Sequence, residues 1–77
     1  MQPLLAYILG NLVDDRDALR VEDRVEGDTL VFRVWVAEDD RGRVIGKHGR
    51  TIQSVRTVVA AAASRLGGGR THVEIVD

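Results

Sequence analysis

Two glycines and several basic residues stand together near the middle of the chain, in the segment Val44, Ile45, Gly46, Lys47, His48, Gly49 and Arg50. Two glycines separated by two residues let the backbone turn tightly and approach a ligand with no β carbon in the way. A helix is expected to begin just after the second glycine, and the free N–H groups and dipole at a helix N-terminus favour a phosphate. The neighbouring basic side chains add positive charge. This segment therefore predicts a site that grips a nucleic-acid backbone.

The surroundings of this glycine loop support that interpretation. Val44 and Ile45, just before the turn, would supply an apolar wall for bases lying beside the clamped strand. The formal net charge of the chain is only −1. Residues 41–56 nevertheless carry five basic and no acidic residues, whereas the rest carries six basic and twelve acidic residues. Arg43 belongs to this basic segment and is expected to take part in binding the nucleic acid. Positive charge is thus concentrated around the loop. A solvated helix face is the alternative explanation of the cluster.

Hydrophobic periodicity predicts six elements around the loop. Apolar residues at three- and four-residue intervals predict the N-terminal helix and the long helix after Gly49, whereas apolar residues alternating with charged ones predict the strands. Asp and Glu at 38–40 favour the start of a short helix, and Gly67 to Gly69 should end the long one. The expected elements are a helix at 3–13, strands at 19–26 and 29–37, helices within 39–66 on either side of the loop, and a strand at 71–77.

These elements predict an α+β fold. About 33 residues with two helices join the second and third strands, so a crossover should leave those strands parallel, while the hairpin partner is antiparallel. A chain of 77 residues forms one small domain, here a mixed three-stranded sheet with three helices on one face. The expected core contains Leu5, Ile8, Leu12, Phe32, Val34, Val36, Val44, Ile52, Val55, Val59, Leu66, Val73 and Ile75.

The glycine loop in this context resembles the KH domain. The matching pattern is V-I-G-K-x-G-R between a short and a long helix, inside an α-β-β-α-α-β order, and it covers almost the whole chain. This is the type II arrangement of bacterial KH proteins. A single KH domain of this length that ends on V-E-I-V-D is similar to the small bacterial RNA-binding proteins of the KhpA (YlqC) type.

The resemblance implies a site and partners. It implies that Gly46, Lys47, His48 and Gly49 contact the backbone of single-stranded RNA and that Ile45 and Arg50 flank the groove. It also implies an RNA chaperone or post-transcriptional regulator in the cytoplasm that forms a homodimer, or a heterodimer with a larger KhpB-like (Jag-type) protein, with effects on cell shape and the cell wall. The competing interpretation is a KH-fold dimerisation module with little RNA affinity of its own.

The residues present give little support to nucleotide binding, metal binding or catalysis. Between Gly42 and Lys47 the spacing is one residue short of a nucleotide-binding P-loop, and His48 stands where that loop needs serine or threonine. His48 and His72 have no clustered partners for a metal, and Ser54 and Ser64 have no base at a helical spacing. We therefore expect no enzyme activity, cofactor, metal or small-molecule substrate.

Two further observations concern surroundings and partners. There is no cysteine, which fits a reducing cytosol, and the N-terminal residues suggest neither an export signal nor a membrane span. Trp35 should share the open face of the sheet with Val31 and Arg33. It either lies flat against Arg33 or a neighbouring strand, or marks a protein interface, where tryptophan and arginine are enriched.

Overall fold

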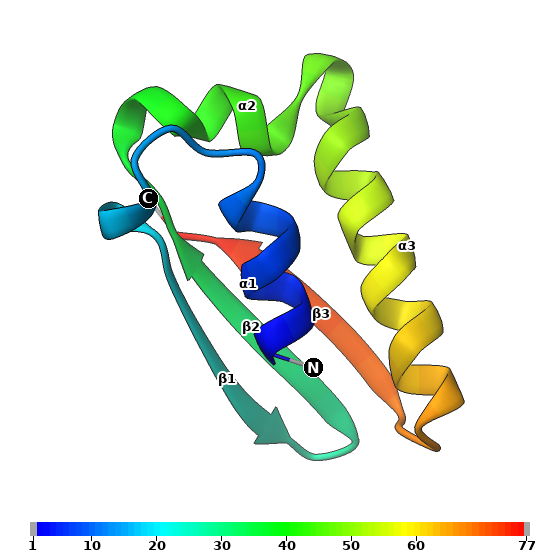
Figure 1. Ribbon diagram of the computed structural model, residues 1–77. Helices are drawn as coiled ribbons and strands as arrows, with labels where there is room; N and C mark the ends of the chain where they lie inside the picture. Colours follow the sequence, from blue (N-terminus) through cyan, green and yellow to red (C-terminus); the bar gives the residue numbers. More distant parts are fainter. Residues whose placement is uncertain (1, 77) are drawn as a thin grey trace.

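A computed structural model describes residues 2–76 and has the expected order of helices and strands (Figure 1). Its helices are α1 (Gln2–Gly10), α2 (Arg41–Ile45) and α3 (Arg50–Arg65), and its strands are β1 (Arg20–Glu26), β2 (Thr29–Trp35) and β3 (Arg70–Ile75). Short 3-10 turns at Arg16–Ala18, Glu38–Asp40 and Lys47–Gly49 lie between them. No helix in residues 2–76 is long and apolar enough to cross a membrane.

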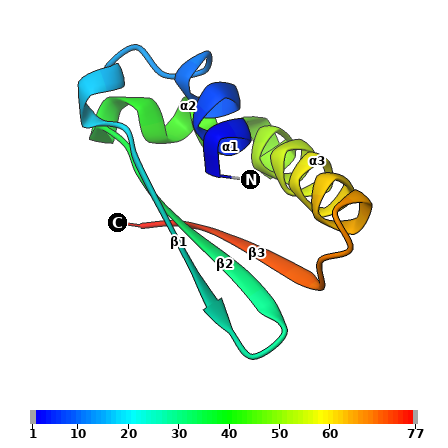
Figure 2. The same ribbon diagram turned by 60° about the horizontal axis from the view of Figure 1, so that its bottom comes forward.

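The three strands form a mixed sheet in the order β1-β2-β3. β1 pairs with β2 antiparallel, and β2 pairs with β3 parallel, with Phe32 opposite Val73. The three helices lie on one side of this sheet, and α3 runs beside β3 (Figure 2). The predicted α+β architecture is confirmed. β3 is an edge strand, so only one of its edges pairs with another strand. Its other edge lies beside α3 and can line a binding site.

The core lies between the sheet and the helices. Phe32, Val34 and Val73 of the sheet are buried against Leu5 of α1 and Val59 of α3. The expectation for Leu66 was wrong, because this side chain is 74% exposed. α3 ends at Arg65 and the chain turns away at Leu66, so Ala63 fills the buried position of the last turn. The expected list also omitted Leu9, Val13 and Val21, which are buried.

Several boundaries differ from the expected ones at the ends of elements. α1 ends at Gly10, three residues early, because Leu12 and Val13 both donate backbone hydrogen bonds to the carbonyl of Leu9 and form a turn. β2 ends at Trp35 rather than at residue 37. β3 ends at Ile75, although the N–H of Val76 still bonds to Val34. Residue 77 of the expected last strand lies outside the described residues.

The open face of the sheet is covered by its own charged side chains. The guanidinium groups of Arg20 and Arg33 lie 4.9 and 5.2 Å from the ring centroid of Trp35. Arg33 also forms an ion pair with Glu74 of the neighbouring strand at 3.1 Å. Trp35 is therefore half-buried under two arginines. This agrees with the prediction that it lies against Arg33 or a neighbouring strand; here it contacts both Arg33 and Arg20 of β1.

Candidate nucleic-acid interface

The glycine loop reverses the chain between α2 and α3 within four residues, Gly46 to Gly49. Gly46 ends α2 with φ 79° and ψ 169°, and its N–H donates to the carbonyl of Gly42 at 2.8 Å. His48 and Gly49 then adopt left-handed backbone angles, with φ of 58° and 72°. Gly49 is the N-cap of α3 and makes no side-chain cap. The N–H of Arg50 donates to the backbone carbonyl of Lys47, and no side chain caps the start of α3. A helix start without a side-chain cap favours an anion.

Gly46 is the residue on which this geometry depends. A β carbon at position 46 would lie 2.6 Å from Cβ of Thr51 and 2.8 Å from its backbone nitrogen, closer than packed atoms approach. The same addition at Gly49 meets nothing within 4 Å. Gly46 is therefore required by both its positive φ and its close contact with α3, whereas Gly49 is required only by its φ.

The basic side chains of the loop are accessible to a ligand. Lys47, His48 and Arg50 are exposed, and Ile45 is half-buried beside them. All four belong to residues 45–50. This stretch joins α2 to α3 (Figure 1). A phosphate at the start of α3 would meet two or three positive groups there, while Ile45 offers an apolar surface to an adjacent base.

A groove of about 520 Å³ continues from the loop between the helices and the edge of the sheet. One wall comes from α2 and α3, and the other comes from β3. Ile45, Ile52 and Ile75 make its apolar surface, and arginines contribute its positive charge. Its lining residues are Arg41, Ile45, Ile52, Arg56, His72, Val73, Glu74 and Ile75. A groove with apolar and basic walls fits unstacked bases and their backbone.

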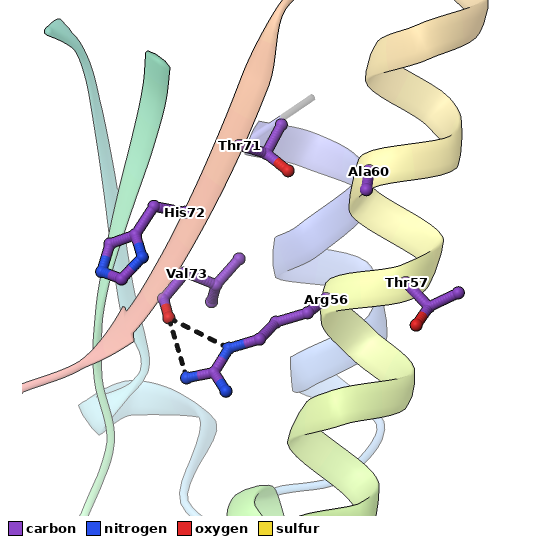
Figure 3. Close-up of a pocket in the computed structure, with 6 residues that line it drawn as sticks. All are labelled: Arg56, Thr57, Ala60, Thr71, His72 and Val73. Carbon is purple, nitrogen blue, oxygen red and sulfur yellow. Dashed lines mark hydrogen bonds between the residues drawn. The ribbon is translucent and has the colours of Figure 1, made fainter.

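Arg56 crosses this groove from α3 to β3 (Figure 3). Its Nε and one of its Nη nitrogens donate to the carbonyl oxygen of Val73 at 3.4 and 3.2 Å. Beyond it, a second hollow of about 260 Å³ continues along the same seam and shares Arg56, His72 and Val73 with the first. Thr57, Ala60 and Thr71 complete its lining. Arg56 therefore stands in the middle of a longer channel.

Two of the predicted site residues have other roles. Val44 is 0% exposed, so its side chain packs in the core and cannot contact a base. The guanidinium of Arg43 lies 2.6 Å from the carboxylate of Asp14 and 3.8 Å from that of Asp40. Its charge is thus directed at the loop after α1 rather than at the groove. From the sequence alone, Arg43 could not be told apart from the basic residues of the loop, because its ion pairs depend on the fold.

Asp40 connects the start of α2 to the segment that follows α1. Its buried carboxylate accepts hydrogen bonds from the backbone N–H groups of Asp14 at 3.1 Å and Asp15 at 3.0 Å. These two bonds hold the pKa of the Asp40 carboxyl below its ordinary value, and the nearby Arg43 acts in the same direction. The α1–β1 connection is thereby tied to the helix that carries the glycine loop.

Sequence reasoning missed the β3 side of the groove. Arg56 was counted in the basic segment, but its place opposite Val73 depends on how α3 packs on β3. His72 was considered only as a metal ligand, and Ile75 only as a core residue. The regular spacing of Ile52 and Arg56 on the long helix is the only signal that places them on the same side, because residues four apart share a helix face.

The fold and the loop together define a KH domain of the type II arrangement. A family model described as "KhpA/KhpB, KH domain" matches residues 2–75, and the chain belongs to this family. It is 39% identical over its whole length to the RNA-binding protein KhpA of Chlamydia pneumoniae, of which it covers 97%. It is 40% identical to KhpA of Halalkalibacterium halodurans with both chains fully covered, and 36% identical to KhpA of Streptomyces coelicolor, 92% covered.

Proposed function

We propose that this protein binds single-stranded RNA in the groove between α3 and β3, with the Gly46–Gly49 loop holding the backbone. One observation carries the proposal: the start of α3, which has no side-chain cap, meets the exposed Lys47, His48 and Arg50 at one end of an apolar groove. Relatives along the full chain are named RNA-binding proteins. Binding is expected to be weak, because a KH groove holds about four nucleotides.

A charge reversal in the loop tests this function. The double variant Lys47→Asp with His48→Asp keeps both glycines and places two carboxylates where the phosphate would lie. The matched control, Ser64→Asp with Arg65→Asp, changes two exposed residues at the far end of α3. In a fluorescence titration with a short single-stranded RNA, the loop variant should lose most binding and the control should retain it. Equal affinity of the folded loop variant and the parent protein would refute RNA binding at this loop.

We further propose that the protein acts in the cytoplasm as an RNA chaperone or post-transcriptional regulator beside a larger KhpB-like partner, with effects on cell shape and the cell wall. The matching family is described as the KH domain of KhpA and KhpB, so a KhpB-like protein would carry a second groove of the same kind. A second groove would raise the affinity of a weak single domain through effective concentration, without any new contact. Pull-down of a KhpB-like protein by this chain at physiological salt checks the association.

The helices offer the better surface for such pairing, with a partner or with a second copy. Tyr7 of α1 is 72% exposed and Val58 of α3 is 46% exposed, whereas Trp35 on the open sheet face is already covered by arginines. Exposed apolar side chains gain most by burial at an interface. This observation also favours the second candidate function, a KH-fold dimerisation module. Sedimentation equilibrium should show that Val58→Lys lowers self-association or partner binding while Ser64→Lys, on the same helix, does not.

A further inference from the structure

We propose that Arg56 contacts the edge of one base in the groove and makes this position prefer guanine or cytosine over adenine or uracil. The inference rests on the proposed RNA-binding function and assigns it a specificity-determining residue. It comes from the way in which Arg56 is held: it spans the groove from α3 and is fixed at its far end by the edge strand β3 (Figure 3).

The hydrogen bonds of Arg56 fix the orientation of its guanidinium. A guanidinium has five N–H donors in one plane. Nε and one Nη direct one N–H each to the carbonyl of Val73, which leaves three N–H groups. Among the residues that the structure describes, these three have no acceptor. Two of them, one on each Nη, are parallel and directed away from the Cδ side of the group. Arg56 therefore presents a planar pair of donors whose direction is set before any ligand binds.

A pair of parallel donors distinguishes the bases by their acceptors. Guanine offers O6 and N7 side by side, and cytosine offers O2 and N3 side by side, so each can accept both N–H groups. Adenine places the N6 amino group beside N7 and beside N1, which sets donor against donor. Uracil places N3–H between its two carbonyls and accepts one bond at a time. In DNA recognition, the bidentate contact of arginine with guanine is the commonest specific contact to a base.

The surroundings of Arg56 suit a base in this orientation. Ile45, Ile52 and Ile75 line the groove on the loop side of Arg56 and provide apolar surface for the face of a ring. On the other side of Arg56, the hollow beside Thr57, Ala60 and Thr71 leaves room for the next nucleotides of the RNA (Figure 3). Arg56 is half-buried, so its donors are partly shielded from water and lose more when they meet a base that cannot accept them.

The test uses the full chain and labelled eight-nucleotide RNAs. Each RNA is a uridine background with one central guanosine, cytidine or adenosine, and all-uridine RNA is the reference. The guanosine and cytidine RNAs should bind at least about fivefold more tightly than the other two, the lower range for one bidentate base contact. Arg56→Gln should reduce this ratio to below about twofold. Arg65→Gln, which removes the same charge from an exposed site outside the groove, should leave the ratio unchanged.

Two results would overturn the inference: equal binding of all four RNAs by the parent protein, or retention of the preference by folded Arg56→Gln. If Arg56→Gln does not fold, Arg56→Lys takes its place, and the cytidine preference should fall because an ammonium lacks the planar fork. Base-independent binding that is still abolished by Lys47→Asp with His48→Asp contradicts only the role of Arg56. Absence of binding to every RNA contradicts the proposed function and the role of Arg56 together.

Discussion

Gly46 packs directly against Thr51, so that a β carbon at position 46 would lie 2.6 Å from Cβ of Thr51. This contact joins the end of α2 to the first turn of α3. Gly49, at the other end of the loop, has a similar φ but open space around it. The two glycines of the motif therefore differ in what they contribute, and this difference leads to the first prediction.

Gly46→Ala should destabilise the protein much more than Gly49→Ala. At Gly49 the cost is that of a left-handed alanine, about 1 to 2 kcal/mol. Gly46, with φ 79° and ψ 169°, lies in a backbone region that is almost restricted to glycine. There a backbone cost of about 1 to 3 kcal/mol and an overpacking cost of similar size give a sum of about 2 to 6 kcal/mol. Urea denaturation monitored by circular dichroism measures both. Equal midpoints for the two variants would show that the contact with Thr51 relaxes at little cost.

The buried carboxylate of Asp40 should make stability depend on pH in the acid range. Its pKa is lowered in the folded state, so its contribution is complete above the unfolded pKa of about 3.9 and is lost as the pH falls through the folded pKa. Asp40→Asn should therefore lower the thermal midpoint at pH 7, and the difference from the parent should shrink towards pH 2. A constant difference across this range would contradict a role for the charge.

Arg43 and Lys47 should differ in their effects on RNA binding. Arg43 is paired with Asp14, whereas Lys47 is an exposed residue of the loop. Arg43→Gln should leave the slope of log K against log[salt] unchanged and cost about 0.2 to 1 kcal/mol of stability, as for exposed ion pairs. Lys47→Gln should reduce that slope by about 0.7, the value for one phosphate of a single strand. Binding titrations of the parent protein and both variants between 50 and 300 mM salt measure these slopes.

Trp35 should report on the open face and not on RNA. It lies under Arg20 and Arg33, on the side of the sheet away from the helices that form the groove. Its emission should stay unchanged when RNA saturates the groove, and Arg20→Gln with Arg33→Gln should increase its quenching by acrylamide. A large change of Trp35 emission on RNA binding would place the ligand on the sheet face instead.

Local patterns were sufficient to predict most of the fold and the glycine loop. The alternation in β2 and the three- and four-residue spacing in α3 depend on near neighbours, and so does the turn at Gly46 and Gly49. Leu66 continued the helical spacing, but the glycines that follow it end the helix before its side chain reaches the core. Hydrophobic periodicity identifies the buried face of a helix, but it does not show at which residue the helix ends.

Relationships between distant residues could not be predicted from the sequence. The bond of Arg56 to Val73 depends on the register between α3 and β3, and the bonds of Asp40 to the backbone of Asp14 and Asp15 join segments about 25 residues apart. Both depend on tertiary packing that leaves no periodic signal. The same reason explains why the role of Arg43 was mispredicted: its charge suggested a phosphate contact, but it pairs with Asp14.

The most direct test of RNA binding in the groove is an amide chemical-shift titration of the 15N-labelled protein with a short single-stranded RNA. The largest shifts should fall in residues 45–52, at Arg56 and along residues 72–75, on the two walls of the groove. The helix α3 and the strand β3, which carry most of these residues, lie side by side (Figure 1). Amides of β1 and of the 3-10 turn Arg16–Ala18 should shift little. Shifts confined to β1 and the open sheet face, with residues 45–52 unchanged at saturation, would contradict the account.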